Sequence, residues 1–521
     1  MRVALLLSMA CTVLGLAGCA ELQPYRTDAP TVAYDASSTP CTPSKDDSST
    51  DGNSGGQVAA QCAHRIREDA STYRLYFSEF DDQGWSFPKG HTYGEATRQI
   101  DVFVGELRDL IQKTDESISV VVFVHGWKHT AQTDDANVKR FRSLLESLDL
   151  VERTTGCRRH VIGLYVGWRG AATALGDPLE SLSFYSRKNA AERVALGDVR
   201  VLFSQLRATQ DLANLPWNEK VQRSLASVSR VAPRPADVIQ PSHSQCDKRM
   251  RLSIAGHSFG GLIVYTSLAQ ALIRDVVDLR QAEDLAAING TGRPTMTREG
   301  DLVVVINPAI EATRFEPLFR AVQQRDLPHY HAPLFVAITS TDDQATRTAF
   351  PLGRSFSTLW EKYAVSDDQR EKRANQTTLG QDEDFLTHTL TAVAYASDGS
   401  VPTAAPGNAI CKGWNVPGAS FKERLDIETA ESATFLQQLE RNGYDAKGLF
   451  PRSFCSLDVL RLGLGTGLGM AAVNSPVWNI QTSKPIVDDH NDFDNPRLIA
   501  FFRQLYREAE FREEQVGARA K

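Results

Sequence analysis

The sequence predicts an α/β protein with a mostly parallel central sheet and helices on both faces of that sheet. Short apolar runs rich in Val and Ile recur along the chain, separated by stretches in which apolar residues have helical spacing. Such runs are typical of strands buried on both faces, as in parallel sheets. A glycine-rich bend, Gly256-His-Ser-Phe-Gly260, joins one of these runs directly to a helical pattern. We therefore expect a large core of alternating strands and helices.

The expected elements begin with an N-terminal hairpin. Its strands are predicted at Tyr73–Phe80 and Trp85–Phe87, with a turn over 81–84. Apolar residues from Ile100 to Ile111 then repeat at helical spacing and predict an amphipathic helix. The later elements, in chain order, are a strand at Ile118–Val124, a helix over 138–148, a strand at His160–Val166, a helical region near 190–206, a strand from Leu252, and strands at Leu302–Ile306, Leu334–Ile338 and Val477–Ile480.

The C-terminal part of the chain contains a less regular segment and a closing helix. Asn495 suits the N-cap and Pro496 suits the first position of that helix. Periodicity is weak over 346–475, so we interpret this segment as an insertion between two parts of the core, 71–345 and 476–521. The insertion either covers the functional site as a lid or lies elsewhere on the surface.

The first residues have the pattern of an export signal. An apolar run over 3–16 is too short and too close to the start for a membrane-spanning helix. The run ends in Leu16-Ala-Gly-Cys19, which resembles the lipobox of bacterial lipoproteins. That resemblance implies that residues 1–18 are a signal peptide, that Cys19 is acylated, and that Ala20 favours the outer membrane, facing the periplasm. Ordinary signal cleavage nearby is the alternative.

Residues 19–70 are interpreted as a flexible tether, because much of this stretch is rich in Ser, Thr, Asp, Gly and Pro. In an exported chain, the cysteines outside the signal and the anchor predict disulfides. We favour sequential pairing, although the sequence leaves the connectivity open: Cys41–Cys62, Cys157–Cys246 and Cys411–Cys455. No Cys-x-x-Cys pair points to structural zinc, and a net charge of -7 gives no reason to expect nucleic acid as a partner.

Ser258 is the leading candidate for a catalytic nucleophile. It lies at the apex of a strand–turn–helix with the pattern Gly-x-Ser-x-Gly, in which Gly256 and Gly260 flank His257, Ser258 and Phe259. Small flanking residues relieve the crowding at such a strained turn and expose the serine. A plain glycine-rich turn is the alternative interpretation.

A serine hydroxyl needs a base to remove its proton and a third group to orient that base. His490 follows the predicted last strand and is the favoured base, with His388 as the second choice. For the acid we favour Asp343, with its neighbour Asp342 close behind, since both follow the predicted strand Leu334–Ile338. One of these two carboxylates could instead cap a turn or a helix.

The developing oxyanion requires hydrogen-bond donors. The backbone N–H of Phe259 is one candidate, and the N–H of Trp127 in His125-Gly126-Trp127 is the second. Trp127, Trp168 and Phe259 would form apolar walls of the substrate pocket. Arg169 could bind an anionic group of the substrate, although a structural ion pair is the more ordinary role.

Together these motifs resemble those of the α/β-hydrolase superfamily: Val-His-Gly-Trp127 after one strand, the Gly-x-Ser-x-Gly turn, Asp343 after a later strand, and the late Asp-His490-Asn-Asp. The likeness covers roughly 73–345 and 477–506, and it is nearest to bacterial serine-hydrolase and esterase-like lipoproteins. It implies acyl-enzyme catalysis by a Ser-His-Asp triad without metal or organic cofactor. The long gap between Asp343 and His490 departs from the family pattern.

We therefore expect a serine hydrolase that cleaves a carboxylic ester or thioester of a small-molecule or lipid-like acyl substrate, held at the membrane by its N-terminal lipid. An acyltransferase on the same fold is an alternative within the enzyme class. A non-catalytic envelope scaffold or binding protein is the alternative from a different class.

Overall fold

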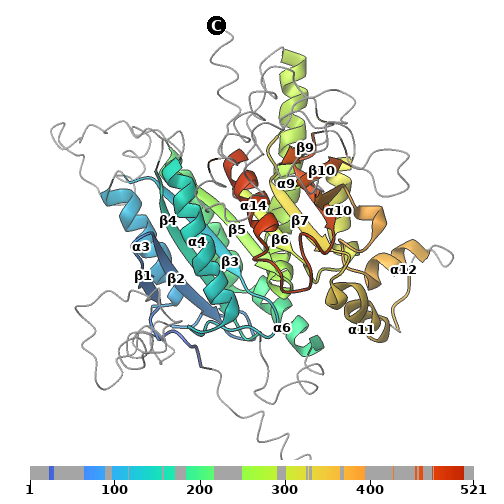
Figure 1. The fold of residues 1–521 in the computed structure, drawn as a ribbon, viewed down its shortest axis with the longest axis horizontal. Helices are drawn as coiled ribbons and strands as arrows, with labels where there is room; N and C mark the ends of the chain where they lie inside the picture. The colour runs from blue at the N-terminus through green and yellow to red at the C-terminus, as the bar shows by residue number, and fades with distance from the viewer. Residues whose placement is uncertain are drawn as a thin grey trace, which may run out of the picture.

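The computed structural model of the chain is shown in Figure 1. It describes residues 23–27, 64–88, 97–114, 116–154, 158–170, 184–215, 249–289, 301–323, 327, 331–358, 360–363, 369–392, 426, 452–454, 457–461, 472 and 474–509. The expected signal peptide 1–18, the lipidation site Cys19 and the disulfide candidates Cys41, Cys62, Cys157, Cys246, Cys411 and Cys455 lie outside these residues.

The described residues form an 11-stranded mixed sheet with the order β1-β2-β4-β3-β5-β6-β7-β11-β8-β10-β9. Its central run from β2 to β8 is parallel throughout, and only β1, β10 and β9 pair antiparallel, at the two edges. The strands are β1 (Arg67–Asp69), β2 (Tyr73–Phe80), β3 (Ile118–Val124), β4 (His160–Trp168), β5 (Met250–His257), β6 (Leu302–Ile306), β7 (Phe335–Ser340), β8 (His388–Ala392), β9 (Arg452–Phe454), β10 (Leu457–Arg461) and β11 (Val477–Thr482).

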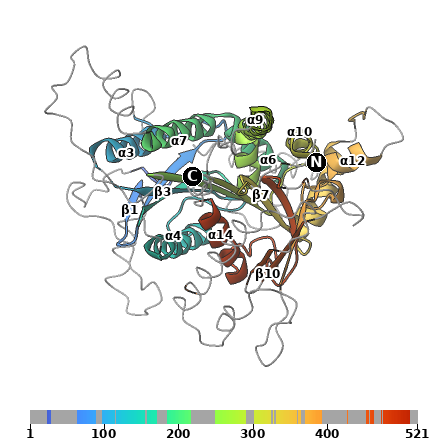
Figure 2. The ribbon, with the colours of Figure 1, turned by 90° about the horizontal axis from the view of Figure 1, so that it is seen from above.

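Helices cover both faces of the sheet, which confirms the predicted α/β architecture. Seen from above, α3, α7 and α9 lie over one face, and α4 and α14 lie over the other (Figure 2). The helices are α3 (Gln99–Lys113), α4 (Ala136–Thr154), α6 (Phe184–Leu196), α7 (Asp198–Asn214), α9 (Phe259–Asn289), α10 (Ala312–Gln323), α11 (Phe350–Ser357), α12 (Gln369–Gln376) and α14 (Pro496–Glu508), with a short π-helix η2 (Ala345–Ala349) and a 3-10 turn η3 (Glu383–Phe385).

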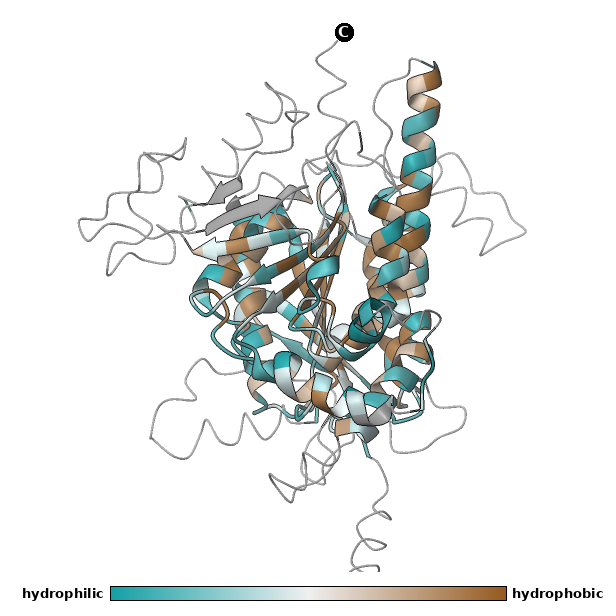
Figure 3. Ribbon diagram, turned by 90° about the vertical axis from the view of Figure 1, so that its right-hand side faces the viewer, coloured by the Kyte–Doolittle hydropathy of each residue, from teal (hydrophilic) through white to brown (hydrophobic). Residues whose placement is uncertain are grey.

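Two apolar cores lie on the two sides of the sheet. Along β3, Val120 and Val122 enter the core beneath α3 and α9, whereas Val121 and Phe123 enter the core beneath α4 and α14. Because β3 is buried on both faces, its sequence is apolar apart from Ser119 and does not alternate, as is typical of parallel strands. In Figure 3 the central strands are mostly brown (hydrophobic), whereas the helices beside them alternate between brown and teal, as expected of helices with one buried face.

The N-terminal hairpin differs from the prediction. The antiparallel partner of β2 is the upstream strand β1, and Ser86 forms only an isolated bridge with Phe80. Asp81 accepts hydrogen bonds from the N–H groups of Gln83 and Trp85, and the N–H of Ser86 donates to Asp198 of α7. The groups of 85–87 that face β2 do pair with the backbone, since the N–H of Asp81 donates to the carbonyl of Trp85 and the N–H of Phe87 donates to the carbonyl of Glu79. The predicted hairpin is therefore present, but it is shorter than expected.

The predicted tether 19–70 also needs correction. Arg26 and Thr27 are buried against the domain, and the core begins with β1, before residue 71. Composition alone could not reveal this, because the contacts of 23–27 are made by the Arg26 side chain and by a few backbone groups.

The predicted insertion 346–475 is not simply a lid, because β8, β9 and β10 continue the sheet beyond β11. The amide of Asn479 on β11 donates to the carbonyl oxygens of Leu379 and Phe385, which fixes the chain leading into β8. Helix α11 lies instead at the lower edge of the molecule in Figure 1, beside α6.

Candidate active site

A strained turn between β5 and α9 presents Ser258. The strand ends at His257, the helix begins at Phe259, and Ser258 between them has φ 57°, in the left-handed region. A Cβ atom on Gly256 would lie 2.6 Å from the carbonyl oxygen of Gly260. A Cβ atom on Gly260 would overlap the carbonyl oxygen of Val124 at the end of β3. The two glycines therefore permit the backbone approach that holds the serine outward.

Ser258, His490 and Asp343 form a continuous hydrogen-bonded chain. Nε2 of His490 lies 2.8 Å from Oγ of Ser258, and Nδ1 of His490 lies 2.8 Å from Oδ2 of Asp343. Asp343 is fully buried, whereas the side chain of His490 is 22% exposed. The imidazole of His490 is therefore partly open to solvent, while the carboxylate behind it is shielded from water.

The two adjacent carboxylates after β7 have different contacts. Asp343 accepts hydrogen bonds from the hydroxyl and N–H of Thr346 and from the N–H of Ala345, so it caps η2 while it orients His490. Burial opposes the charge of Asp343, but the hydrogen bonds from His490 and Thr346 outweigh that effect and hold its pKa below its usual value. Asp342 instead accepts from the N–H of Lys484. Of the two alternatives, the geometry selects Asp343.

Two residues that the sequence did not single out for this purpose hold the backbone of the histidine loop. The carbonyl oxygen of His490 accepts from Nε2 of His257 at 2.7 Å and from the amide of Asn307 at 3.1 Å. Burial lowers the pKa of the His257 imidazole far below its ordinary value, so this ring is neutral and donates from Nε2. Asn307 follows β6 with φ 43°, and its position after a strand end was the one available signal.

The loop after β3 lies against Ser258. A Cβ atom on Gly126 would lie 2.9 Å from Cβ of Ser258, so only glycine allows this approach. Nδ1 of His125 donates to the Gly126 carbonyl, and Nε2 accepts from the N–H of Trp168. Burial lowers the pKa of His125 to about 4, so the imidazole is neutral at pH 7 and holds the loop through these two hydrogen bonds. The roles of the Phe259 and Trp127 amides at an oxyanion stay predictions.

Aromatic rings cluster beside this loop. Phe184 lies 5.3 Å from Trp127 and 4.9 Å from Phe259, between ring centroids, and Phe350 also packs on Phe184. The indole N–H of Trp127 is buried and has no hydrogen-bond partner among the described residues. Phe184 and Phe350 were not predicted, because nothing local in the sequence marks them as neighbours of the serine.

The other predicted pocket residues have structural contacts. Trp168 is almost fully buried, and its indole N–H donates to the carbonyl of His125. The carbonyl of Arg169 accepts a hydrogen bond from Arg187, whose guanidinium pairs with Asp82.

His388, the second choice for the base, lies on β8, where its ring packs 4.6 Å from that of Trp478 and Nδ1 lies 2.8 Å from the hydroxyl of Thr387. The structure therefore assigns the contact with Ser258 to His490. In the part of the chain that the structure describes, no group of three or more His, Cys, Asp or Glu side chains is arranged to hold a metal ion. None of the described helices combines the length and apolarity needed to cross a membrane.

The chain matched nothing when compared with protein-family models, curated proteins and solved structures.

Proposed function

We propose that this protein is a serine hydrolase of the α/β-hydrolase type that cleaves a carboxylic ester or thioester through an acyl-enzyme. The hydrogen-bonded chain from Ser258 through His490 to Asp343, at a turn with a strained serine, carries the proposal. A serine with only a structural role has no need of a partly exposed histidine that is itself hydrogen-bonded to a buried carboxylate. This arrangement is the one that acyl transfer by serine requires.

The first half-reaction forms the acyl-enzyme. Oγ of Ser258 attacks the substrate carbonyl carbon while Nε2 of His490 takes the hydroxyl proton. The Asp343 carboxylate holds Nδ1–H and stabilises the imidazolium that forms. The carbonyl oxygen becomes an oxyanion facing the N–H groups of Phe259 and Trp127. When the tetrahedral intermediate collapses, the bond to the leaving alcohol or thiol breaks and Nε2–H donates its proton to that group.

The second half-reaction returns the free enzyme. Water replaces the alcohol, gives its proton to Nε2 of His490 and attacks the acyl carbon. The bond to Ser258 Oγ then breaks, the proton returns to Oγ, and a carboxylic acid leaves. An alcohol or amine in place of this water would give acyl transfer instead.

The topology supports the α/β-hydrolase assignment despite the long gap between acid and base. Strands β7 and β11 are parallel neighbours, with Ser340 opposite Thr482, so the loops that follow them meet at one edge of the sheet. The intervening chain places β8, β10 and β9 beyond β11 rather than between β7 and β11. The long separation between Asp343 and His490 in the sequence therefore does not prevent their loops from meeting.

For the location of the protein we propose a lipid anchor at Cys19 and the outer membrane, facing the periplasm. The Leu-Ala-Gly-Cys motif at 16–19 supports this proposal. Mass spectrometry of the N-terminal peptide from membranes is the test, with a fatty-acylated Cys19 as the expected result. An unmodified peptide that begins elsewhere would contradict it.

Hydrolysis of a panel of p-nitrophenyl esters with increasing chain length tests the activity. We expect turnover by the wild-type protein and a loss of about 10³-fold or more in Ser258→Ala. Competing alcohols and amines in the same assay separate acyl transfer from hydrolysis. A folded wild-type protein that cleaves no ester or thioester would favour a non-catalytic binding role.

A further inference from the structure

The N-terminal segment 23–27 docks into the domain through Arg26. The guanidinium lies 3.7 Å above the ring of Phe77, pairs with Glu68 at 3.0 Å and donates to the carbonyl of Ala131 at 2.8 Å. The N–H of Arg26 donates to Glu79 at 2.7 Å. Arg26 is fully buried. We call the site formed by Glu68, Phe77, Glu79 and Ala131 the Arg26 slot.

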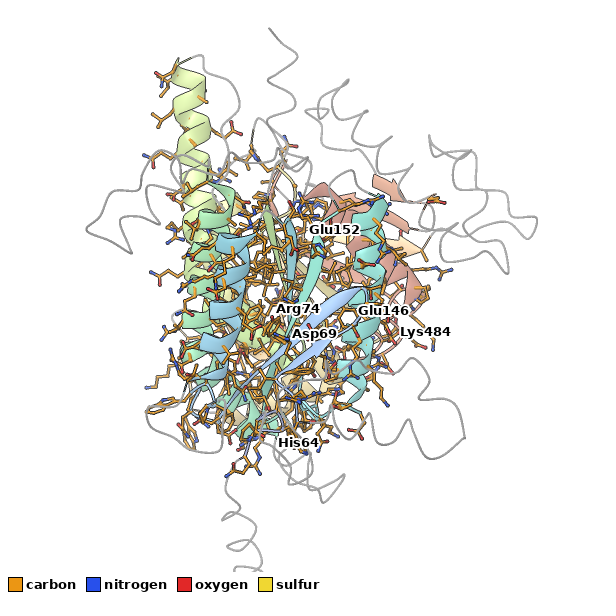
Figure 4. All side chains as sticks on the ribbon, turned by 90° about the vertical axis from the view of Figure 1, so that its left-hand side faces the viewer. His64, Asp69, Arg74, Glu146, Glu152 and Lys484 are labelled. Atoms are coloured by element: carbon orange, nitrogen blue, oxygen red, sulfur yellow. The ribbon has the colours of Figure 1, made fainter. Side chains whose placement is uncertain are left out.

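This slot lies at the catalytic edge of the sheet. Ala131 belongs to the loop after β3 that also carries Gly126, and Glu79 is near the carboxyl end of β2. His64, whose Nδ1 lies 3.1 Å from the carbonyl oxygen of Tyr25, is at the lower edge in Figure 4, below Asp69 and Arg74. Arg74 is near the start of β2, so the lower edge is where the parallel strands end.

The position of Arg26 in the sequence limits how far the domain can move from an anchor at Cys19. Arg26 follows Cys19 by seven residues, which reach at most about 25 Å when fully extended. By comparison, the 31 residues of α9 alone extend over about 46 Å. A domain anchored in this way cannot turn its opposite end toward the membrane.

Large apolar side chains are exposed at the same edge. Trp85, in the loop after β2, is 66% exposed, and Leu352 on α11 is 62% exposed. The loop of Trp85 is tied to α6 by the pair between Arg187 and Asp82, and Figure 1 shows α6 and α11 at this edge. Tryptophan is favoured at the boundary between lipid and water.

We propose that the catalytic edge lies against the membrane surface and that the substrate is an acyl ester of a membrane lipid. The short link from Cys19 to the Arg26 slot fixes this orientation, and the exposed apolar side chains contact the headgroup region. This inference rests on the hydrolase function and the lipid anchor proposed above.

Two spacer insertions in the full-length, lipidated protein test the inference. A flexible Gly-Ser spacer of about 20 residues between Ala20 and Glu21 lengthens the link from Cys19 to Arg26 by about 25 Å on average. The same spacer between Gly55 and Gly56 lengthens the chain equally but leaves the link to Arg26 unchanged. Both variants are reconstituted in phosphatidylethanolamine–phosphatidylglycerol vesicles that contain a fluorogenic phospholipid ester.

We expect the spacer at Ala20 to lower hydrolysis of the vesicle-bound ester at least tenfold, and the spacer at Gly55 to leave it unchanged. Both variants should cleave a water-soluble p-nitrophenyl ester at the wild-type rate. Equal effects of the two spacers on the lipid ester would overturn the inference. So would a wild-type protein that cleaves the soluble ester but not the lipid ester, and in that case the hydrolase function would stand.

Hydrogen exchange gives a readout that does not depend on activity. On vesicles, compared with the Cys19→Ala protein in solution, we expect added protection over 126–131 and 351–358. No added protection is expected at 284–289, at the far end of α9, where Ile288 is also exposed. Protection at 284–289 alone would overturn the proposed orientation even if no ester were cleaved. An unmodified Cys19 in the peptide map would also overturn the proposed orientation, because the orientation depends on the lipid anchor.

Discussion

Asp342 and Asp343 are neighbours in sequence, but only Asp343 contacts the imidazole of His490. The difference follows from the direction of the chain after β7. Asp343 points into the buried space behind His490 and accepts from the N–H of Ala345, the first residue of η2, whereas Asp342 points toward the N–H of Lys484 in the neighbouring loop. The two positions therefore offer a matched pair of variants.

Asp343→Asn should lower kcat by on the order of 10³- to 10⁴-fold, because an amide can neither stabilise the imidazolium nor fix the same tautomer. Asp342→Asn should lower kcat less than tenfold, since an amide oxygen can still accept from Lys484. Steady-state kinetics on a soluble ester provide the measurement. Equal losses in both variants would exclude Asp343 as the orienting acid.

Glu79 should make the stability of the protein depend on pH. Burial raises its pKa from 4.5 to about 7, although the N–H groups of Tyr25 and Arg26 act in the opposite direction. Between these two pH values the folded state binds more protons than the unfolded state, so the contribution of Glu79 to stability falls as pH rises through this window. Glu79→Gln should remove that decline, measured by denaturant unfolding at pH 5, 6 and 7. An unchanged slope in the variant would contradict the prediction.

At the residue scale the sequence predicted Ser258, His490 and Asp343, because serine chemistry requires a fixed order of roles after particular strands. Asn307 and Arg26 were not predicted as part of the structure around the site. Asn307 reaches His490 across a sequence separation of 183, and Arg26 reaches Ala131 across 105. A single polar contact between residues so far apart in the sequence produces no periodic pattern from which it could be predicted.

At the scale of elements, the turn at 256–260 depends on the absence of side chains where β5, β3 and α9 meet. Gly260 faces the carbonyl oxygen of Val124 and has no room for a Cβ atom. Gly105 offers a control on α3, because it is exposed and a Cβ atom there would meet nothing within 4 Å.

Gly260→Ala should therefore lower the free energy of unfolding by about 2 kcal/mol or more, because the backbone must shift. Gly105→Ala should raise it by about 0.5–1 kcal/mol, since alanine is the better helix former. Denaturant unfolding compares both variants with the wild type. A neutral Gly260→Ala would contradict the account of the turn.

Element prediction succeeded where the apolar pattern decides the structure, as in β3 and β5, which are buried on both faces. It was incomplete at 85–87 and over 346–475, for different reasons. At 85–87 the predicted pairing is present but limited to one bridge, between Phe80 and Ser86. In 346–475, β8 joins the sheet by pairing with Ile480 and Gln481 of β11, which are distant in sequence.

At the scale of the whole molecule, the N-terminal segment and the core form one packed unit around Arg26. Its guanidinium pairs with the buried carboxylate of Glu68, and its backbone N–H donates to the buried carboxylate of Glu79. Arg67 provides a control, because its side chain is 44% exposed where it pairs with Asp69 and Glu106.

Arg26→Ala should lower the free energy of unfolding by about 3–5 kcal/mol, because it leaves buried charge without its partner. Arg67→Ala should cost about 0–1 kcal/mol, since exposed pairs contribute little. Thermal and denaturant unfolding of both variants provide the comparison. Similar small losses in both would show that segment 23–27 does not contribute to the core.

Labelling with a fluorophosphonate probe, followed by peptide mapping, tests the activation of Ser258 most directly. A covalent adduct on Ser258 is expected in the wild-type protein, and the adduct should be absent in Ser258→Ala and strongly reduced in His490→Ala. A folded wild-type protein that stays unlabelled, or an adduct on a different serine, would contradict the account.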